Sequence, residues 1–297
     1  MIKAGSRRVV FVVVVVIGIV VVVVDGGGFT VGKEQREFDY FILALQWPST
    51  SCTNVTVCCT TNACCRRAVS PTEFTIHGLW PKYEGKGWPS CCTNETFDET
   101  QIRSLFEDVD KYWPTYRCGL VSSCDNRKGS FWAHQYEKHG TCGSPVILQE
   151  YDYFLTTLTL FYKYNVTEAL ENAEIVASDT KKYPIQDVLN AVHSAFKVNP
   201  KLACVKKGII KEIYLCFDKQ FKLRDCDATK SCPKSVKLPK FHKPHGKLNR
   251  SKLIGTRREL KMSSMKPKRN PNEKSHRRRT DKEDPSLLRG AHKRRTY

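Results

Sequence analysis

The sequence predicts a disulfide-stapled α+β domain, and three observations lead to that fold class. Segments with strand character, such as 37–47 and 209–217, are interspersed with segments of helical periodicity, such as 151–164 and 184–198. The two kinds do not follow the regular βαβ rhythm of a doubly wound sheet. Fourteen cysteines are typical of a disulfide framework formed in an oxidising compartment.

Residues 1–28 have the features of a secretory signal peptide. Lys3, Arg7 and Arg8 precede an apolar run of sixteen residues, 9–24, and three glycines follow it at 26–28. Sixteen residues fall short of the roughly 20 that span a bilayer, so a cleaved signal peptide is favoured over an uncleaved signal anchor. We therefore expect no stable membrane association.

Residues 29–239 suffice for one domain with a substantial core. Residues 74–76 are a further strand candidate, which would deliver His77 at its end. In 98–113 the apolar residues fall on one helical stripe, and Pro114 ends it. In chain order, the expected elements are a strand at 37–47, a strand at 74–76, a helix at 98–113, helices at 151–164 and 184–198, and a strand at 209–217.

The composition changes after Pro239. Residues 240–297 contain 20 Lys/Arg and 5 Asp/Glu, a net charge of +15, whereas the whole chain carries +19. The basic character therefore belongs to this segment, which has few aromatic or branched residues and is expected to be a disordered tail. Basic runs in it can bind RNA phosphates or resemble a nuclear signal; a processed extension is an equally good interpretation.

Two short motifs carry the candidate chemistry. The segment 131–142, FWAHQYEKHGTC, holds His134, Lys138 and His139, and in a helix His134 would lie above Lys138 and Gln135 above His139. A second motif, FTIHGLWP at 74–81, supplies His77. A lone histidine is more often a structural residue, but three histidines with lysine and tryptophan in two compact motifs favour general acid–base catalysis on a phosphate.

These two segments, in this order, resemble the active-site segments of the ribonuclease T2 family, and the resemblance extends from about Glu37 to Leu238. Within the family the chain most resembles the plant S-like ribonucleases of the class II, vacuolar type, with their paired cysteines and a KSCP segment. The resemblance implies a central antiparallel sheet flanked by helices. It also implies cleavage of single-stranded RNA through a 2′,3′-cyclic phosphate to 3′-phosphate ends, in the service of RNA turnover.

The resemblance also implies a role for each site residue. His139 would be the base, His77 the acid, His134 the residue that holds the phosphate, and Lys138 the group that stabilises its negative charge. This chemistry needs no cofactor and no metal ion, because RNA carries its own nucleophile in the 2′-hydroxyl. The candidate substrate-binding residues are Trp80, Phe131, Gln46 and Gln135.

One position departs from the family pattern. The family usually has glutamate after the first histidine of the helix, and this chain has Gln135. Glu137 is a doubtful substitute, because it lies about 200° around a helix from Gln135. We therefore expect a working but weakened nuclease. The alternatives are a catalytically weakened RNA-binding or signalling relative, or a pollen-rejection ribonuclease; a purely structural disulfide-rich module fits the histidine motifs least.

Several further expectations concern covalent structure and location. Paired cysteines at 58/59, 64/65 and 91/92 lack zinc-finger spacing, so disulfides are favoured over a metal site. Sequons for glycosylation occur at Asn54, Asn94 and Asn165. We expect a monomer of the secretory pathway, located in the vacuole or outside the cell. The resemblance implies the bridges Cys52–Cys58, Cys59–Cys118, Cys92–Cys142, Cys204–Cys232 and Cys216–Cys226, and leaves Cys64, Cys65, Cys91 and Cys124 for others.

Overall fold

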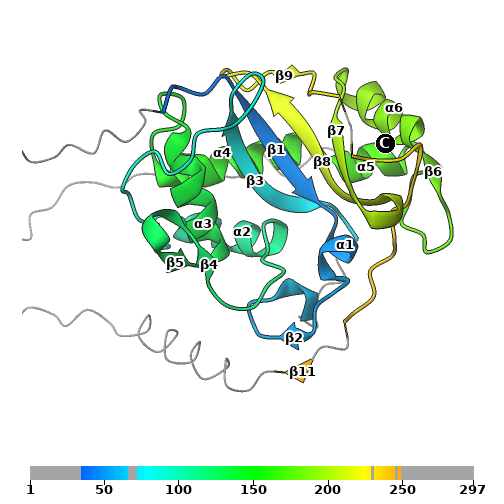
Figure 1. Ribbon diagram of the computed structural model, residues 1–297, viewed down its shortest axis with the longest axis horizontal. Coiled ribbons are helices and arrows are strands. Elements are labelled where there is room, and N and C mark those ends of the chain that lie inside the picture. The colour runs from blue at the N-terminus through cyan, green and yellow to red at the C-terminus, as the bar shows by residue number, and fades with distance from the viewer. Residues whose placement is uncertain (1–34, 66–71, 229–230, 245–246, 249–297) are drawn as a thin grey trace, which may run out of the picture. The chain divides into compact units, whose positions relative to one another are not determined.

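The structure, a computed structural model, describes residues 35–65, 72–228, 231–244 and 247–248. Its centre is an antiparallel sheet whose strands run in the order β3, β1, β8 and β7, with β9 pairing with β8 (Figure 1). The predicted α+β class with a central antiparallel sheet is therefore confirmed. The strands of this sheet are β1 (Tyr40–Gln46), β3 (Thr75–Lys82), β7 (Lys201–Val205), β8 (Ile209–Phe217) and β9 (Leu223–Arg224).

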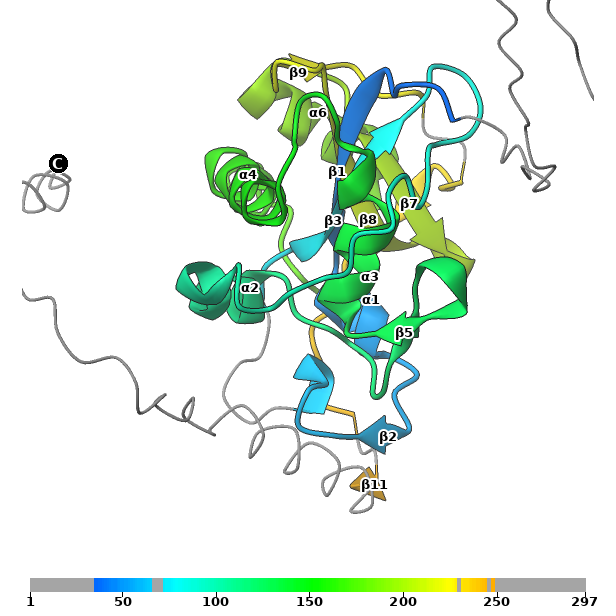
Figure 2. The same ribbon diagram turned by 90° about the vertical axis from the view of Figure 1, so that its left-hand side faces the viewer.

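Helices cover the sheet and enclose the core. In Figure 2, α4 and α2 lie on one side of the strands, and α4 contacts both β1 and β3. All seven residues of β1 are buried, and alternate ones, Phe41, Leu43 and Leu45, face the main core. The helices are α1 (Pro48–Cys52), α2 (Phe106–Tyr112), α3 (Phe131–Lys138), α4 (Glu150–Lys163), α5 (Val166–Glu171) and α6 (Ile185–Phe196).

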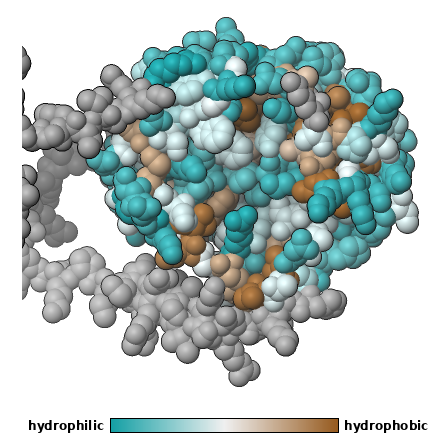
Figure 3. Space-filling view, in the orientation of Figure 1, coloured by the Kyte–Doolittle hydropathy of each residue, from teal (hydrophilic) through white to brown (hydrophobic). Residues whose placement is uncertain are grey.

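Short elements complete the described part of the chain. Three two-stranded pairs join β10 to β6, β11 to β2 and β4 to β5. These strands are β2 (Val57–Cys58), β4 (Val121–Ser122), β5 (Lys128–Gly129), β6 (Tyr183–Pro184), β10 (Ser235–Val236) and β11 (Lys247–Leu248). The 3₁₀ helices are η1 (Ala63–Cys65), η2 (Arg103–Leu105), η3 (Cys124–Asn126), η4 (Gly140–Cys142) and η5 (Lys206–Gly208). Hydrophilic residues cover most of the face drawn in Figure 3.

Two predicted boundaries are wrong by more than three residues, and the strand expected at 37–47 is shorter, Tyr40–Gln46. The helix expected from Asp98 begins only with η2 at Arg103 and continues as α2, because the Asp98 carboxylate accepts hydrogen bonds from the N–H and hydroxyl of Thr100 and closes a turn. The strand expected to end before His77 continues through it to Lys82, since β3 pairs with β1 on both sides of His77. By contrast, the strand expected at 209–217 has those bounds.

Seven disulfides staple the domain, and four of them are predicted pairs: Cys59–Cys118, Cys92–Cys142, Cys204–Cys232 and Cys216–Cys226. The predicted Cys52–Cys58 bridge is wrong, because the structure joins Cys52 to Cys64 and Cys58 to Cys65. The physical reason is η1, which presents two adjacent cysteines in different directions, one toward the end of α1 and one toward β2. The seventh bridge joins Cys91 to Cys124.

The ends of the predicted domain are only partly described. The predicted signal peptide, 1–28, and the predicted tail beyond Leu248 lie outside the described residues. Hydrogen bonds to the domain continue past Pro239, where the Trp47 indole donates to the Pro239 carbonyl and His242 pairs with Asp179. All three sequon asparagines are exposed. Among the described residues, none of the helices combines the length and apolar character needed to cross a bilayer.

Candidate active site

His77 occupies a bulge in β3. On the neighbouring strand, Ala44 pairs with Gly78 and Leu45 pairs with Ile76, so His77 is the extra residue without a partner. A bulge re-aims the side chain that it carries. The His77 carbonyl accepts a hydrogen bond of 2.9 Å from the buried indole of Trp113. The backbone of His77 is thereby held in place by the core.

The ring of His77 is held from β8. Its Nδ1 lies 2.7 Å from Oε1 of Glu212, a residue that is only 4% exposed. Burial alone would raise the Glu212 pKa, but hydrogen bonds from His77 and Tyr214 and the charges of His77 and Lys211 outweigh it, and the pKa falls to about 2. Glu212 is therefore ionised and accepts the Nδ1 proton, which leaves Nε2 of His77 for other partners.

The second motif folds as α3 and η4. Ser130 caps α3 by accepting from the N–H of Ala133, and the helix ends where His139 becomes the C-cap. The rings of His134 and His139 lie 6.0 Å apart, edge to face. Nδ1 of His134 donates to the Ser122 carbonyl over 2.5 Å. Burial lowers the pKa of His134, and the neighbouring charge of Lys138 lowers it further.

His139 is nine-tenths buried, and its surroundings differ from those of His77, whose ring is held by a carboxylate. Its Nδ1 is buried and has no hydrogen-bond partner in the described part of the chain. Burial, reinforced by the charges of His134 and Lys138, lowers the pKa of His139 to about 3. The ring is therefore neutral at any physiological pH, which is the state that a proton acceptor requires.

Trp80 connects the two histidines. Its ring lies 5.0 Å from that of His77, edge-on, and 5.6 Å from that of His139. The imidazoles of His77 and His139 therefore pack against the same indole, so the two sequence motifs meet in one site. The Trp80 indole nitrogen donates to Oε1 of Gln135 over 3.0 Å, so a side chain of α3 fixes the orientation of the indole.

Gln135 is a buried support rather than an exposed ligand. It is 1% exposed, and its Oε1 lies so close to Gly78 that a Cβ there would overlap both Oε1 of Gln135 and Nε1 of Trp80. The glycine after His77 is thus required by close packing. Sequence reasoning grouped Gln135 with the substrate-binding residues, but the structure places it beneath Trp80.

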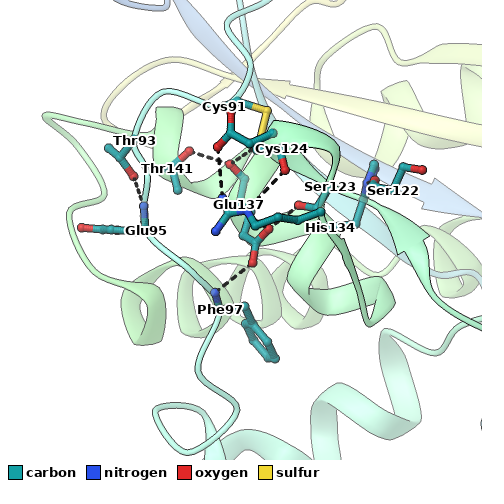
Figure 4. A network of polar contacts seen from close by, with 12 residues as sticks. Cys91, Thr93, Glu95, Phe97, Ser122, Ser123, Cys124, His134, Glu137 and Thr141 are labelled. Atoms are coloured by element: carbon teal, nitrogen blue, oxygen red, sulfur yellow. Dashed lines mark hydrogen bonds and ion pairs between the residues drawn. A yellow bond between two sulfur atoms is a disulfide. The ribbon is translucent and has the colours of Figure 1, made fainter.

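The Glu137 carboxylate is held by two flanking loops and does not replace the missing carboxylate. It accepts hydrogen bonds from the N–H of Phe97, over 3.1 Å, and from the hydroxyl of Ser123 (Figure 4). Arg127 lies 3.9 Å away. Glu137 therefore ties two flanking loops to α3, and the Cys91–Cys124 bridge lies in the same network.

The remaining predicted residues occupy different positions relative to the site. The ring of Phe131 stacks on that of His77 at 5.9 Å. Lys138 is half-buried, and its charge acts on both His134 and His139. Gln46 is buried, and its amide nitrogen donates to the Ile76 carbonyl over 3.1 Å, so this nitrogen is used by the sheet.

Sequence reasoning missed the roles of Glu212 and Trp113, which bond to His77, and of Tyr214, which bonds to Glu212. A signal for Glu212 was present, because a single carboxylate interrupts the apolar run 209–217 and a buried charge requires a partner. Among the described residues, no cluster of three or more histidine, cysteine or carboxylate ligands is arranged to hold a metal ion.

The fold and the site define a disulfide-bonded α+β protein in which two histidine-bearing segments meet beside one tryptophan. A family model described as "Ribonuclease T2 family" matches residues 38–226. "Ribonuclease 3" from Arabidopsis thaliana is 35% identical over 214 residues, which cover 69% of this chain and 91% of that protein. The chain therefore belongs to the ribonuclease T2 family.

Solved structures agree with this assignment. Trichomaglin, described as a novel S-like ribonuclease, is 55% identical with a TM-score of 0.67, and the match covers 69% of this chain and 100% of that one. An RNase-related protein from Calystegia sepium is 43% identical with a TM-score of 0.65, covering 69% and 98%. The similarity to S-like ribonucleases is confirmed.

Proposed function

We propose that this chain is a metal-independent endoribonuclease that cleaves single-stranded RNA through a 2′,3′-cyclic phosphate. The proposal rests on the different environments of the His77 and His139 imidazoles, which both pack against Trp80. Ionised Glu212 holds Nδ1 of His77, whereas His139 is buried, neutral and without a hydrogen bond at Nδ1 among the described residues. One ring is thus prepared to donate a proton and the other to accept one.

In the proposed first step, His139 removes the proton of the 2′-hydroxyl, and the resulting oxygen attacks the adjacent phosphorus. His134 and Lys138 stabilise the negative charge of the phosphorane. His77 gives its Nε2 proton to the departing 5′-oxygen, the P–O5′ bond breaks, and the cyclic phosphate remains. In the second step, water replaces the departed group with the proton transfers reversed, and a 3′-phosphate results. Trp80 and Phe131 are the aromatic surfaces available for bases, whose stacking tolerates any sequence.

A weakened activity is the second part of the proposal. Gln135 brings no negative charge to the site, and the pKa of about 3 makes His139 a poor base in the free protein. These two observations also support the alternative function, an RNA-binding or signalling relative with little turnover. The seven disulfides support a route through the secretory pathway. From there we propose a role in RNA turnover in the vacuole or outside the cell.

The deciding experiment is digestion of single-stranded RNA in the presence of EDTA, with end-group analysis of early products. We expect cyclic-phosphate ends from the wild type and none from His77→Ala or His139→Ala. Retained RNA binding without cleavage in the wild type would select the RNA-binding alternative. Loss of cleavage on adding EDTA would contradict the metal-independent mechanism.

A further inference from the structure

We propose that Glu212 is the positioning residue of the proton donor, and that it acts on the reaction only through His77. This inference rests on the proposed function, because it assigns a task within that mechanism. The carboxylate touches His77 through Oε1, whereas its other oxygen, Oε2, accepts a hydrogen bond from the Tyr214 hydroxyl. Both oxygens are therefore engaged, and the carboxylate has a single orientation.

The strand order explains how Glu212 reaches His77. The strands β8 and β3 are not neighbours, since β1 lies between them. In the register of the sheet, Glu212 pairs with Gln46 of β1, and Ala44, two residues away on the same face, pairs with Gly78 and Tyr214. The amide nitrogen of Gln46 donates to the Ile76 carbonyl of β3, and Ala44 presents only a methyl group. The bulge re-aims His77, and its hydrogen bond to Glu212 crosses the middle strand.

Packing does not explain a carboxylate at this position. Glu212 is 4% exposed on a strand that also carries the fully buried Ile213 and Leu215, and a buried carboxylate weakens a fold unless its partners compensate. The nearest lysine, Lys211, is 45% exposed and lies 3.6 Å from the same oxygen that His77 contacts. The hydrogen bond to His77 is therefore the structural reason for an ionised group here.

The chemical consequence concerns one proton. While Glu212 accepts the Nδ1 proton, Nε2 is the only nitrogen from which His77 can deliver a proton to the leaving oxygen. When Nε2 has given up its proton, Nδ1 keeps its own, so the neutral ring is ready to take a proton from water in the second step. Without the carboxylate, the ring can rotate and adopt the other tautomer, and proton donation becomes inefficient.

The test compares two substrates that differ in their need for an acid. A dinucleotide releases an alkoxide that must be protonated, whereas a nucleoside 3′-(4-nitrophenyl phosphate) releases a nitrophenolate that leaves without help. For Glu212→Gln we expect kcat on the dinucleotide to fall roughly 10- to 100-fold with KM nearly unchanged, and the nitrophenyl ester to be cleaved at close to the wild-type rate. The matched control is Glu84→Gln, which removes an exposed carboxylate paired with Arg224.

Further variants make the result decisive. The same substrate selectivity is expected for His77→Ala, and the double variant His77→Ala/Glu212→Gln should lose nothing more, because the two residues act as a unit. Tyr214→Phe, which keeps the carboxylate and removes one hydrogen bond, should give the same selectivity with a smaller loss and serves if Glu212→Gln does not fold. An equal loss on both substrates in a folded variant, or no loss on the dinucleotide, would overturn the inference.

A failure of the proposed function is recognised separately. If the wild type cleaves neither substrate, the proposed function is wrong, and NMR of labelled histidines then decides on Glu212. The titratable groups around His77 are Glu212, whose carboxylate also contacts Lys211 and Tyr214, and His134 and His139 of the second motif. We expect the Nδ1–H resonance of His77 to be shifted downfield in the wild type and to lose that shift in Glu212→Gln. An unchanged resonance would refute the contact itself.

Discussion

The substitution Gln135→Glu restores a negative charge beneath Trp80, and we expect it to raise activity. The new carboxylate would keep the hydrogen bond from the Trp80 indole and strengthen it, because the acceptor becomes charged. Since Gln135 is 1% exposed, the gain would not come from contact with the phosphate. It would come from the electrostatic effect on His139, whose ring lies 5.6 Å from that of Trp80.

The size of the effect follows from the helix, because the His139 N–H donates to the Gln135 carbonyl and residues four apart have Cβ atoms about 5–6 Å apart. A unit charge at a separation on the order of 6 Å, in a medium of effective dielectric constant about 20, contributes roughly 2–3 kcal/mol, or about two pKa units. The charge favours the protonated ring, so the pKa of His139 would rise from about 3 toward neutrality. If about half of the change in basicity is expressed in the transition state, kcat rises roughly tenfold.

The assay is the pH dependence of kcat on a dinucleotide, measured for the wild type and Gln135→Glu. A matched control is Gln186→Glu, which adds the same charge on the exposed face of α6. We expect the acid side of the profile to move to higher pH only in Gln135→Glu. No gain in a variant with wild-type circular dichroism, or an equal gain in the control, would refute the electrostatic reasoning.

Three other predictions concern the support of the site. Removing Cys91–Cys124 or Cys204–Cys232, which close loops of similar length at separations of 33 and 28, should lower the free energy of unfolding by roughly 3–4 kcal/mol each. At a temperature where both variants are folded, only the loss of Cys91–Cys124 should also reduce kcat, because that bridge anchors the loops around α3. Burial raises the pKa of Glu150 to about 7, so its stabilising contribution is complete below pH 4.5 and is lost as the pH rises through 7. Glu150→Gln should therefore raise the free energy of unfolding in urea by roughly 1–2 kcal/mol at pH 7.5 and leave it unchanged at pH 4.5. Gly78→Ala should displace Trp80 and reduce kcat at least tenfold, and wild-type activity in that variant would contradict the described packing.

Hydrophobic patterns in the sequence predicted the strands and helices whose formation depends on neighbouring residues in the chain. The apolar run at 209–217 became β8, and the aromatic periodicity at 151–164 became α4 with nearly the same bounds. The start of α2 was missed because the Asp98 side chain competes for backbone N–H groups, an interaction that hydrophobic periodicity does not register.

The site itself depended on facts that only the folded chain contains. The bulge at His77 exists because two residues of β1 face three of β3, and its partner Glu212 is 135 residues away in the chain. Strand order, rather than any motif, makes these residues neighbours. The same limit explains the wrong Cys52–Cys58 pair, since the position of η1, which brings Cys64 to Cys52, exists only in the folded chain.

His77 and His139 differ in their proton-transfer roles because different groups surround each ring. His77 is reached by a carboxylate because it lies on the sheet, where β8 supplies Glu212 from the other side of β1. His139 ends a helix among cationic neighbours and lies against an indole, and no carboxylate is among the groups that act most strongly on it. A neutral Gln135 beneath that indole preserves the difference, because a carboxylate there would pull both rings toward the charged state. The glutamine at position 135 therefore keeps His77 as the proton donor and His139 as the proton acceptor, but it also makes His139 a weaker base. The two parts of the proposed function, a defined mechanism and a low rate, thus have one physical cause.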